Sequence, residues 1–458
     1  MTKQIGKNKL KFIFWAAAIF IIGAIAQVSL IIPALLVSLC AYIKARRLNL
    51  KSLNFLNLAL LFLIFLTAGY FIINKWEAFY IPFSVIPMLT VLLSNNLEIS
   101  LLITLASSLS IASFSNSPFE LALPSLISGI SASIFILGAR KRTTIIRAGI
   151  LVGIVQVISF ILMDHFLINQ PQRYLILMLN GVVSSVIVLG VLPVFEYLFK
   201  TVTNISLLEL TDSHHPLLQR MALEAPGTYH HSLVVGNLSE SACEAIGANA
   251  LLARIGSYYH DVGKLQKPDY FSENQDASMS KHDTLAPTMS KLIIMNHVKE
   301  GVELAKKYNL NPALIDFILQ HHGNSLVYYF YRRALENLEE EQEVKEEGFR
   351  YPGPLPNTKE TAIVLLADSV EAATRALKEP TAAKIEEVVH KVINNKFIDG
   401  QLDECDLTLK DLEKISKVFI RILSGIYHSR VTYPEEQKIS ENNHKKFPKE
   451  DPYRSEKD

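Results

Sequence analysis

Long apolar runs separated by short polar connections dominate the first 200 residues. Most of these runs approach the ~20 residues that a helix needs to cross a bilayer. They occupy residues 12–43, 55–74, 78–94, 97–115, 119–139, 145–167 and 174–199. The first run is long for one span and short for two. The pattern therefore predicts a polytopic bundle of transmembrane helices over residues 1–200, with about seven or eight spans of a lipid bilayer.

The connections between the runs differ in charge, and this difference predicts an orientation. Those at Lys44–Lys51 and Arg140–Arg147 are basic, whereas those at Ser115–Glu120 and Asn169–Gln172 contain neither lysine nor arginine. Positively charged loops stay on the cytoplasmic side of a membrane. Counting spans from the first basic loop returns the chain to the cytoplasm near residue 200. We therefore expect everything after that point to be cytoplasmic.

After residue 200 the pattern changes to helical periodicity without sustained β-branched alternation, which predicts an all-α domain. We expect helices at 233–245, 251–259, 287–308, 312–320, 360–377, 382–395 and 409–427. The predicted organisation is a membrane region at 1–200, a linker helix at 201–223 and a helical domain at 224–434. The polar segment 435–458 lacks the apolar surface to offset its ordering entropy, so we expect a disordered tail.

Charge divides the chain at the same point. Residues 1–200 carry 15 Lys and Arg against 5 Asp and Glu, and residues 201–458 carry 30 against 39, so the overall +1 combines +10 with −9. A domain with a charge of −9 is a poor partner for long nucleic acids. The three cysteines are far apart and form no C-x-x-C pair. This excludes a disulfide framework and a thiolate metal site, and it fits a reducing compartment.

Five of the 13 histidines, together with two aspartates, sit in contexts that suit metal binding. They are His231, His260, Asp261, His297, His321, His322 and Asp368. Such ligands suit zinc, manganese or iron, and two ions about 3.5–4 Å apart can activate a water for attack on a phosphoryl group. His260 and Asp261 share the last turn of a predicted helix, which would let Asp261 bridge two ions. We expect ordinary surface, capping or core positions for the other histidines, His230 and His282 among them.

The sequence resembles the HD-domain metal-dependent phosphohydrolases, whose pattern is a histidine, a His-Asp doublet and a late aspartate. His231, His260, Asp261 and Asp368 match that pattern. The chain is still more similar to the seven-transmembrane HD proteins that hydrolyse cyclic di-AMP, over about residues 50–435. This closer similarity is carried by EAPGTYHHS at 224–232, YHDVGK at 259–264, QHHG at 320–323, FRYPGP at 349–354 and LDECDLTL at 402–409.

The resemblance implies an HD phosphohydrolase domain that holds two divalent metal ions, with manganese or iron expected. One ion would be held by His231, His260, Asp261 and Asp368. The other would be held by Asp261, His297, His321 and His322. Asp261 would thus be a shared catalytic ligand. Lys264 follows closely and would place its ammonium group on the substrate phosphate, or would complement the end of the helix.

The same resemblance implies a phosphodiesterase of bacterial second-messenger turnover that converts cyclic di-AMP to linear pApA. It also implies a multi-pass protein of the bacterial inner membrane with a cytoplasmic HD domain. Members of this group usually carry a large extracytoplasmic domain after the first span, and we find no such insert here. We expect base recognition by aromatic stacking, with Tyr328, Tyr329, Phe330 and Tyr331 as candidates.

Two alternatives stay open at this point. An HD hydrolase could act on another nucleotide, although Gln320-His-His-Gly-Asn-Ser lacks the Gly-Tyr-Pro signature of cyclic di-GMP enzymes. A receptor could bind a cyclic dinucleotide without cleaving it, and loss of a metal ligand would be its mark. The sequence leaves the oligomeric state open, with a homodimer as one option.

Overall fold

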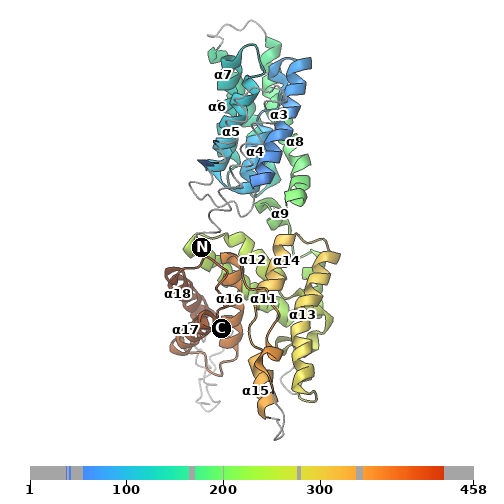
Figure 1. Ribbon diagram of the computed structural model, residues 1–458, viewed down its shortest axis with the longest axis vertical. Helices are drawn as coiled ribbons and strands as arrows, with labels where there is room; N and C mark the ends of the chain where they lie inside the picture. Colours follow the sequence, from blue (N-terminus) through green and yellow to red (C-terminus); the bar gives the residue numbers. More distant parts are fainter. Residues whose placement is uncertain are drawn as a thin grey trace, which may run out of the picture.

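The computed structural model describes residues 38, 41, 42, 55–163, 171–199, 201–275, 280–336 and 344–427. An apolar helical bundle forms one end of the molecule, and a second helical body forms the other (Figure 1). Most of the predicted first run at 12–43, the basic loop at 44–51 and the predicted tail at 435–458 lie outside the described residues. The all-helical architecture confirms the predicted fold class.

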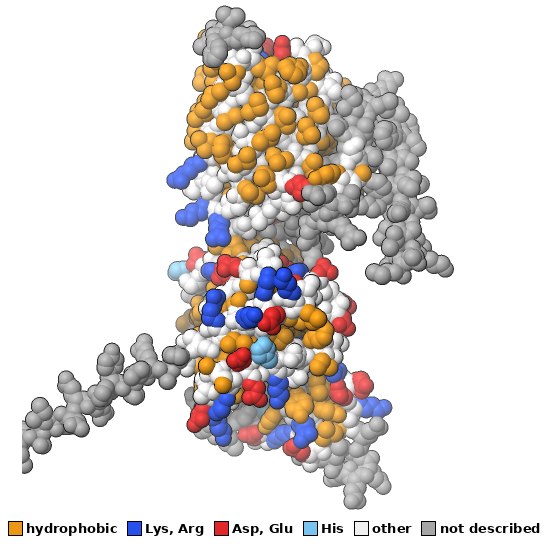
Figure 2. All heavy atoms as spheres, turned by 90° about the vertical axis from the view of Figure 1, so that its left-hand side faces the viewer, with side chains coloured by type: hydrophobic (Ala, Val, Ile, Leu, Met, Phe, Trp, Pro, Cys, Tyr) orange, Lys and Arg blue, Asp and Glu red, His pale blue; other side chains and the backbone are white. Residues whose placement is uncertain are grey.

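Four of the described helices are long and apolar enough to cross a membrane. They are α3 (Phe55–Lys75), α6 (Pro118–Ile136), α7 (Arg142–Met163) and α8 (Pro171–Phe199). Two shorter apolar helices, α4 (Val85–Ser94) and α5 (Leu97–Ala112), pack among them. Hydrophobic side chains cover the visible surface of this bundle (Figure 2). Such a surface is suited to lipid rather than to water.

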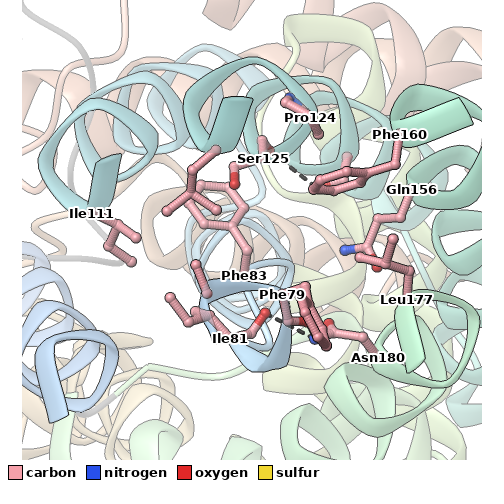
Figure 3. Close-up of a pocket in the computed structure, with 13 residues that line it drawn as sticks. Phe79, Ile81, Phe83, Ile111, Pro124, Ser125, Gln156, Phe160, Leu177 and Asn180 are labelled. Atoms are coloured by element: carbon pink, nitrogen blue, oxygen red, sulfur yellow. Dashed lines mark hydrogen bonds between the residues drawn. The ribbon is translucent and has the colours of Figure 1, made fainter. Parts of the chain in front are cut away.

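The apolar run at 78–94, predicted as one span, is not a single helix. It begins with a short 3-10 helix, η1 (Ala78–Tyr80), and becomes α-helical only at Val85, so α4 is about 15 Å long. Pro82 in the break has no N–H to donate. The Asn180 side chain donates instead to the carbonyls of Phe79 and Ile81, at 3.1 and 2.9 Å (Figure 3). Irregular backbone at membrane depth is tolerated where other groups of the protein form hydrogen bonds with its N–H and C=O groups.

Helices α7 and α8 approach closely because glycines face one another. Gly149 and Gly153 on α7 lie against Gly181 on α8. A Cβ added at Gly181 would overlap the backbone of both α7 glycines. Small residues of this kind let transmembrane backbones make extensive van der Waals contact.

Gly181→Val should therefore lower the stability of the bundle by about 1–3 kcal/mol, because the added side chain forces α7 and α8 apart. Thermal unfolding of the detergent-solubilised protein measures this loss. Gly190→Val is the matched control on the same helix, since a Cβ there meets no atom within 4 Å. Equal melting temperatures for the two variants would contradict the proposed packing role.

Two short helices, α9 (Asn204–Glu209) and α10 (Pro216–Glu224), occupy the segment predicted as one linker helix. They are separate because Pro216 can begin a helix but cannot continue one. The junction is held by side chains at the end of α8. Glu196 accepts hydrogen bonds from the Thr203 N–H and the Ser206 hydroxyl, both at 2.8 Å. Arg142, at the start of α7, forms an ion pair with Glu209 at 2.8 Å.

The second body consists of helices around a buried apolar core. They are α11 (Pro226–Ile246), α12 (Ala250–Tyr259), α13 (Pro287–Lys307), α14 (Pro312–Gln320), α15 (Tyr328–Glu336), α16 (Lys359–Arg375), α17 (Ala382–Ile398) and α18 (Leu409–Ile426). Helix α16 runs through the centre, with Ile363, Leu366 and Val370 fully buried. Helix α15 was not predicted. Helix α11 begins seven residues earlier than predicted and so includes His231.

Candidate metal centre

Five segments of the second body bring the seven predicted ligands together. His231 lies on α11, His260 and Asp261 follow the end of α12, His297 lies on α13, His321 and His322 follow α14, and Asp368 lies on α16. The ligand atoms form two groups, each with its members within 4.8 Å of one another. One group is His231, His260, Asp261 and Asp368, and the other is His297, His321 and His322.

Asp261 lies between the two groups, with one carboxylate oxygen toward each. Its Oδ2 is 3.2 Å from His260 Nε2 and 3.7 Å from His231 Nε2. Its Oδ1 is 3.4 Å from His297 Nε2 and 3.5 Å from His321 Nε2. A carboxylate in this position has the geometry of a bridging ligand.

Close packing of two backbones sets the position of Asp261. Helix α12 ends at Tyr259 with His260 as its C-cap, and after Asp261 the chain turns into a 3-10 helix, η2 (Val262–Gln266). Gly263 in that turn lies against the carbonyl of His297 on α13, where a Cβ would overlap it. The absence of a side chain at position 263 therefore lets Asp261 and His297 approach the same point.

A hydrogen bond from Nδ1 orients three of the predicted imidazole ligands. Nδ1 of His260, His297 and His321 donates to the backbone carbonyls of Ser257, Ile294 and Ile318, at 2.6, 2.5 and 2.9 Å. Because a carbonyl only accepts, each of these Nδ1 atoms carries a proton, and Nε2 is the nitrogen that faces Asp261. Outer contacts of this kind fix the tautomer and orientation of metal-binding histidines.

Buried polar atoms at the centre lack the partners that burial normally requires. Within the described residues, His260 Nε2 and Asp261 Oδ1 are buried without a hydrogen bond. Burial lowers the pKa of His297 to about 4, so this imidazole is neutral at pH 7, as a metal ligand must be. Burial alone would raise the pKa of Asp261, but the charges of His260 and Lys264 hold it well below its usual value. The donor set and its unsatisfied atoms fit divalent cations.

The ammonium group of Lys264 contacts two carboxylates. Its Nζ is 2.7 Å from both Asp261 Oδ2 and Glu273 Oε1, and its side chain is 12% exposed. Although burial opposes it, the charge of Lys264 lowers the pKa of Glu273 to about 2. This geometry supports charge compensation of Asp261 more directly than the predicted contact with a substrate phosphate.

The centre is partly exposed on one side, at His322 and Asp368, which we call the opening. The side chains of His322 and Asp368 are 22% and 10% exposed, whereas those of the other ligands are almost fully buried. His322 is also covered on one face by Tyr351, whose ring stacks on the imidazole at 4.3 Å between centroids. A substrate must therefore approach beside His322 and Asp368.

Three residues around the centre were not found from the sequence. They are Glu273, Tyr351 and Glu371. Glu371 lies one helical turn after Asp368 on α16, and its carboxylate is 2.5 Å from His231 Nδ1. This i, i+3 spacing is the one sequence signal that could have identified it.

The predicted aromatic stacking residues lie elsewhere. Tyr328 and Tyr329 are exposed on α15, and Phe330 is buried in a small cluster with Ala334 and Phe349. No contact joins these side chains to the metal-ligand groups within the described residues. The prediction that they recognise a base gains no support from this arrangement.

Glu371→Gln should weaken metal binding about 10–100-fold, because a neutral amide orients His231 less firmly than a carboxylate and does not raise the basicity of the imidazole as a carboxylate does. Titration of the metal-free protein with Mn²⁺, followed by calorimetry, measures the change. Glu387→Gln is a matched control on the exposed face of α17. An unchanged Mn²⁺ affinity in Glu371→Gln would show that the His231–Glu371 contact does not support the site.

The site and the helices that build it define an HD domain attached to a bundle of membrane helices. Residues 228–373 match the HD domain family, and residues 18–203 match the family described as 7TM receptor with intracellular HD hydrolase. The chain belongs to this seven-transmembrane HD family.

Individual relatives agree with this assignment. Cyclic-di-AMP phosphodiesterase PgpH of Bacillus subtilis is 44% identical over 319 residues, which are 68% of this chain and 44% of that protein. The protein of the same name from Listeria monocytogenes is 38% identical over 394 residues, 84% of this chain and 54% of that one. The chain thus spans about half the length of the curated relatives it matches.

The solved structures that resemble this chain include the L. monocytogenes PgpH HD domain in complex with cyclic-di-AMP. That structure is 48% identical, covers 48% of this chain and 100% of its own, and superposes with a TM-score of 0.45.

Proposed function

We propose that this protein is a membrane-anchored, metal-dependent phosphodiesterase that hydrolyses cyclic di-AMP to linear pApA. The observation that carries the proposal is the position of Asp261, which presents one oxygen to each of two ligand groups. Two relatives with this activity in their names align with most of the chain, at 44% and 38% identity. These relatives support adenine rather than guanine as the base of the substrate.

The two ligand groups would each hold one divalent ion, with Asp261 shared between them, and manganese or iron suits the donor set. When bound, two such ions lower the pKa of a water and offset charge on a phosphate. The protein's own residues prepare for this chemistry. Backbone carbonyls orient His260, His297 and His321, and Lys264 balances the charge of Asp261.

The phosphodiester would approach beside His322 and Asp368, whose side chains are the most exposed of the predicted ligands. A phosphate that enters there would meet both ligand groups, because Asp368 belongs to one and His322 to the other. Hydrolysis would break one phosphorus–oxygen bond of the ring, with the 3′ oxygen leaving as an alcohol. The product is a linear dinucleotide with a terminal phosphate.

We also propose that the protein lies in the bacterial inner membrane with its HD domain in the cytoplasm. Arg142, part of the basic connection between α6 and α7, forms its ion pair with Glu209 on the side of the bundle that faces the HD domain. This position agrees with the preference of positive loops for the cytoplasm.

The test is hydrolysis by the purified full chain in detergent with Mn²⁺, with cyclic di-AMP and cyclic di-GMP offered separately. Chromatography should show linear pApA from the first and much slower cleavage of the second. Metal-loaded protein that binds cyclic di-AMP and cleaves neither nucleotide would favour a receptor. Preferential cleavage of cyclic di-GMP would reject the proposed substrate.

A further inference from the structure

A cyclic dinucleotide carries two phosphates, and the two metal-ligand groups account for only one of them. The second phosphate remains charged when it enters the protein, so it requires a cation or hydrogen-bond donors of its own. The domain as a whole carries an excess of acidic residues. Any such cation must therefore lie close to the opening and must be available for a ligand.

Most cations around the opening are already paired with carboxylates. Lys264 contacts Asp261 and Glu273, as described above. Arg350 contacts Asp399 at 2.8 Å and Glu346 at 2.7 Å, and Arg375 contacts Glu371 at 3.3 Å. A carboxylate beside a guanidinium or ammonium group offsets the attraction of that cation for a phosphate and occupies some of its N–H donors.

Lys396 differs from these residues. It lies near the end of α17, is half-buried, and has no carboxylate oxygen within 4 Å of Nζ among the described residues. Its ammonium group donates one hydrogen bond, to the Ser325 hydroxyl at 2.6 Å. An ammonium group has three donors, so two are left for another partner.

Hydrogen bonds around Ser325 link Lys396 to the segment that carries His322, the most exposed of the predicted ligands. The Ser325 N–H donates to the carbonyl of His322 at 3.0 Å, and the Ser325 carbonyl accepts from the Tyr351 N–H at 3.0 Å. His322 lies at the opening, and the Tyr351 ring stacks on it. Burial lowers the pKa of Lys396, and the negative charges of Asp368 and Asp399 oppose this change.

We propose that Lys396 binds the second phosphate of the cyclic dinucleotide, the one that is not hydrolysed. The inference rests on the proposed function. Ser325 positions the ammonium group beside the opening, and the remaining two N–H groups donate to the phosphate oxygens. Since this phosphate does not react, Lys396 binds the ground state and the transition state about equally.

Loss of such an interaction has a defined kinetic signature. Lys396→Gln in the full chain should raise the KM for cyclic di-AMP about tenfold or more, equivalent to about 1.4 kcal/mol, and leave kcat within about twofold. Lys396→Arg should retain most of the affinity. Lys391→Gln is the matched control, because Lys391 is exposed on the same helix. An unchanged KM in Lys396→Gln overturns the proposal.

A substrate with one phosphate separates binding from a structural role. Bis(p-nitrophenyl) phosphate should be cleaved equally well by the wild type and Lys396→Gln, because it has no second phosphate to lose. Equal losses with both substrates would instead mean that Lys396 supports the loop at Ser325 or acts at the reacting phosphate. Failure of the proposed function looks different: the wild type itself would cleave the synthetic diester and leave cyclic di-AMP intact.

Discussion

Asp261→Asn is expected to lower the hydrolysis of cyclic di-AMP by about a hundredfold to a thousandfold, because asparagine cannot bridge two cations. Its amide keeps one oxygen acceptor and replaces the other oxygen with a donor. One of the two ligand groups then faces an N–H instead of a lone pair. Lys264, which contacts Asp261 Oδ2 at 2.7 Å, also loses its negatively charged partner.

The same variant should lose metal as well as activity. Elemental analysis after gel filtration measures the ions retained by each chain, and the variant should retain fewer than the wild type. Asp269→Asn is a matched control, because Asp269 is exposed and pairs with Lys281 outside the site. A variant at Asp261 with wild-type activity and metal content would falsify the bridging role.

Gly263→Ala is expected to have the second-largest effect, although it adds a single methyl group. The added Cβ would overlap the His297 carbonyl and press on the Gly301 N–H, both in the backbone of α13. A side chain could avoid the overlap by changing its rotamer, but backbone atoms cannot. We therefore expect α13 to move away from η2. His297 would then leave the position that faces Asp261.

A displacement of about 1 Å at a catalytic group can cost about a hundredfold in rate, and we expect a loss of that order. Activity assays and thermal unfolding should both report the change. Gly425→Ala provides the comparison, since a Cβ at this exposed position on α18 meets no atom within 4 Å. If Gly263→Ala matched Gly425→Ala in both assays, the close approach of η2 and α13 would not control the site.

The sequence predicted the helices of the membrane region well where hydrophobicity alone decides the structure. The runs at 55–74, 119–139, 145–167 and 174–199 correspond to α3, α6, α7 and α8. The run at 78–94 was different, because its conformation depends on a tertiary contact. Asn180, about 100 residues later, supplies the hydrogen bonds that permit the break before α4.

A similar division applies to the candidate site. The spacing and chemistry of His231, His260 and Asp261 were visible in the sequence, and the structure places the predicted ligands together. The surrounding contacts were not visible, because they join segments far apart in the chain. Glu371 reaches His231 across 140 residues, and Lys396 reaches Ser325 across 71. No periodic pattern encodes such pairings.

The short helix α14 connects the membrane end of the protein to the metal centre. At its start, the Asn311 side chain caps the helix and donates to the carbonyl of Thr201, two residues after the end of α8, at 2.8 Å. At its end stand His321 and His322. The helix is about 14 Å long, so a tilt of about 4° displaces its end by about 1 Å.

Metal coordination tolerates deviations of only about 0.2 Å. Helix α14 therefore joins the segment that follows α8, through Asn311, to the two predicted ligands at its other end. A change in bilayer thickness or lateral tension that tilts α14 would change the distances between the metal ligands without altering any ligand residue.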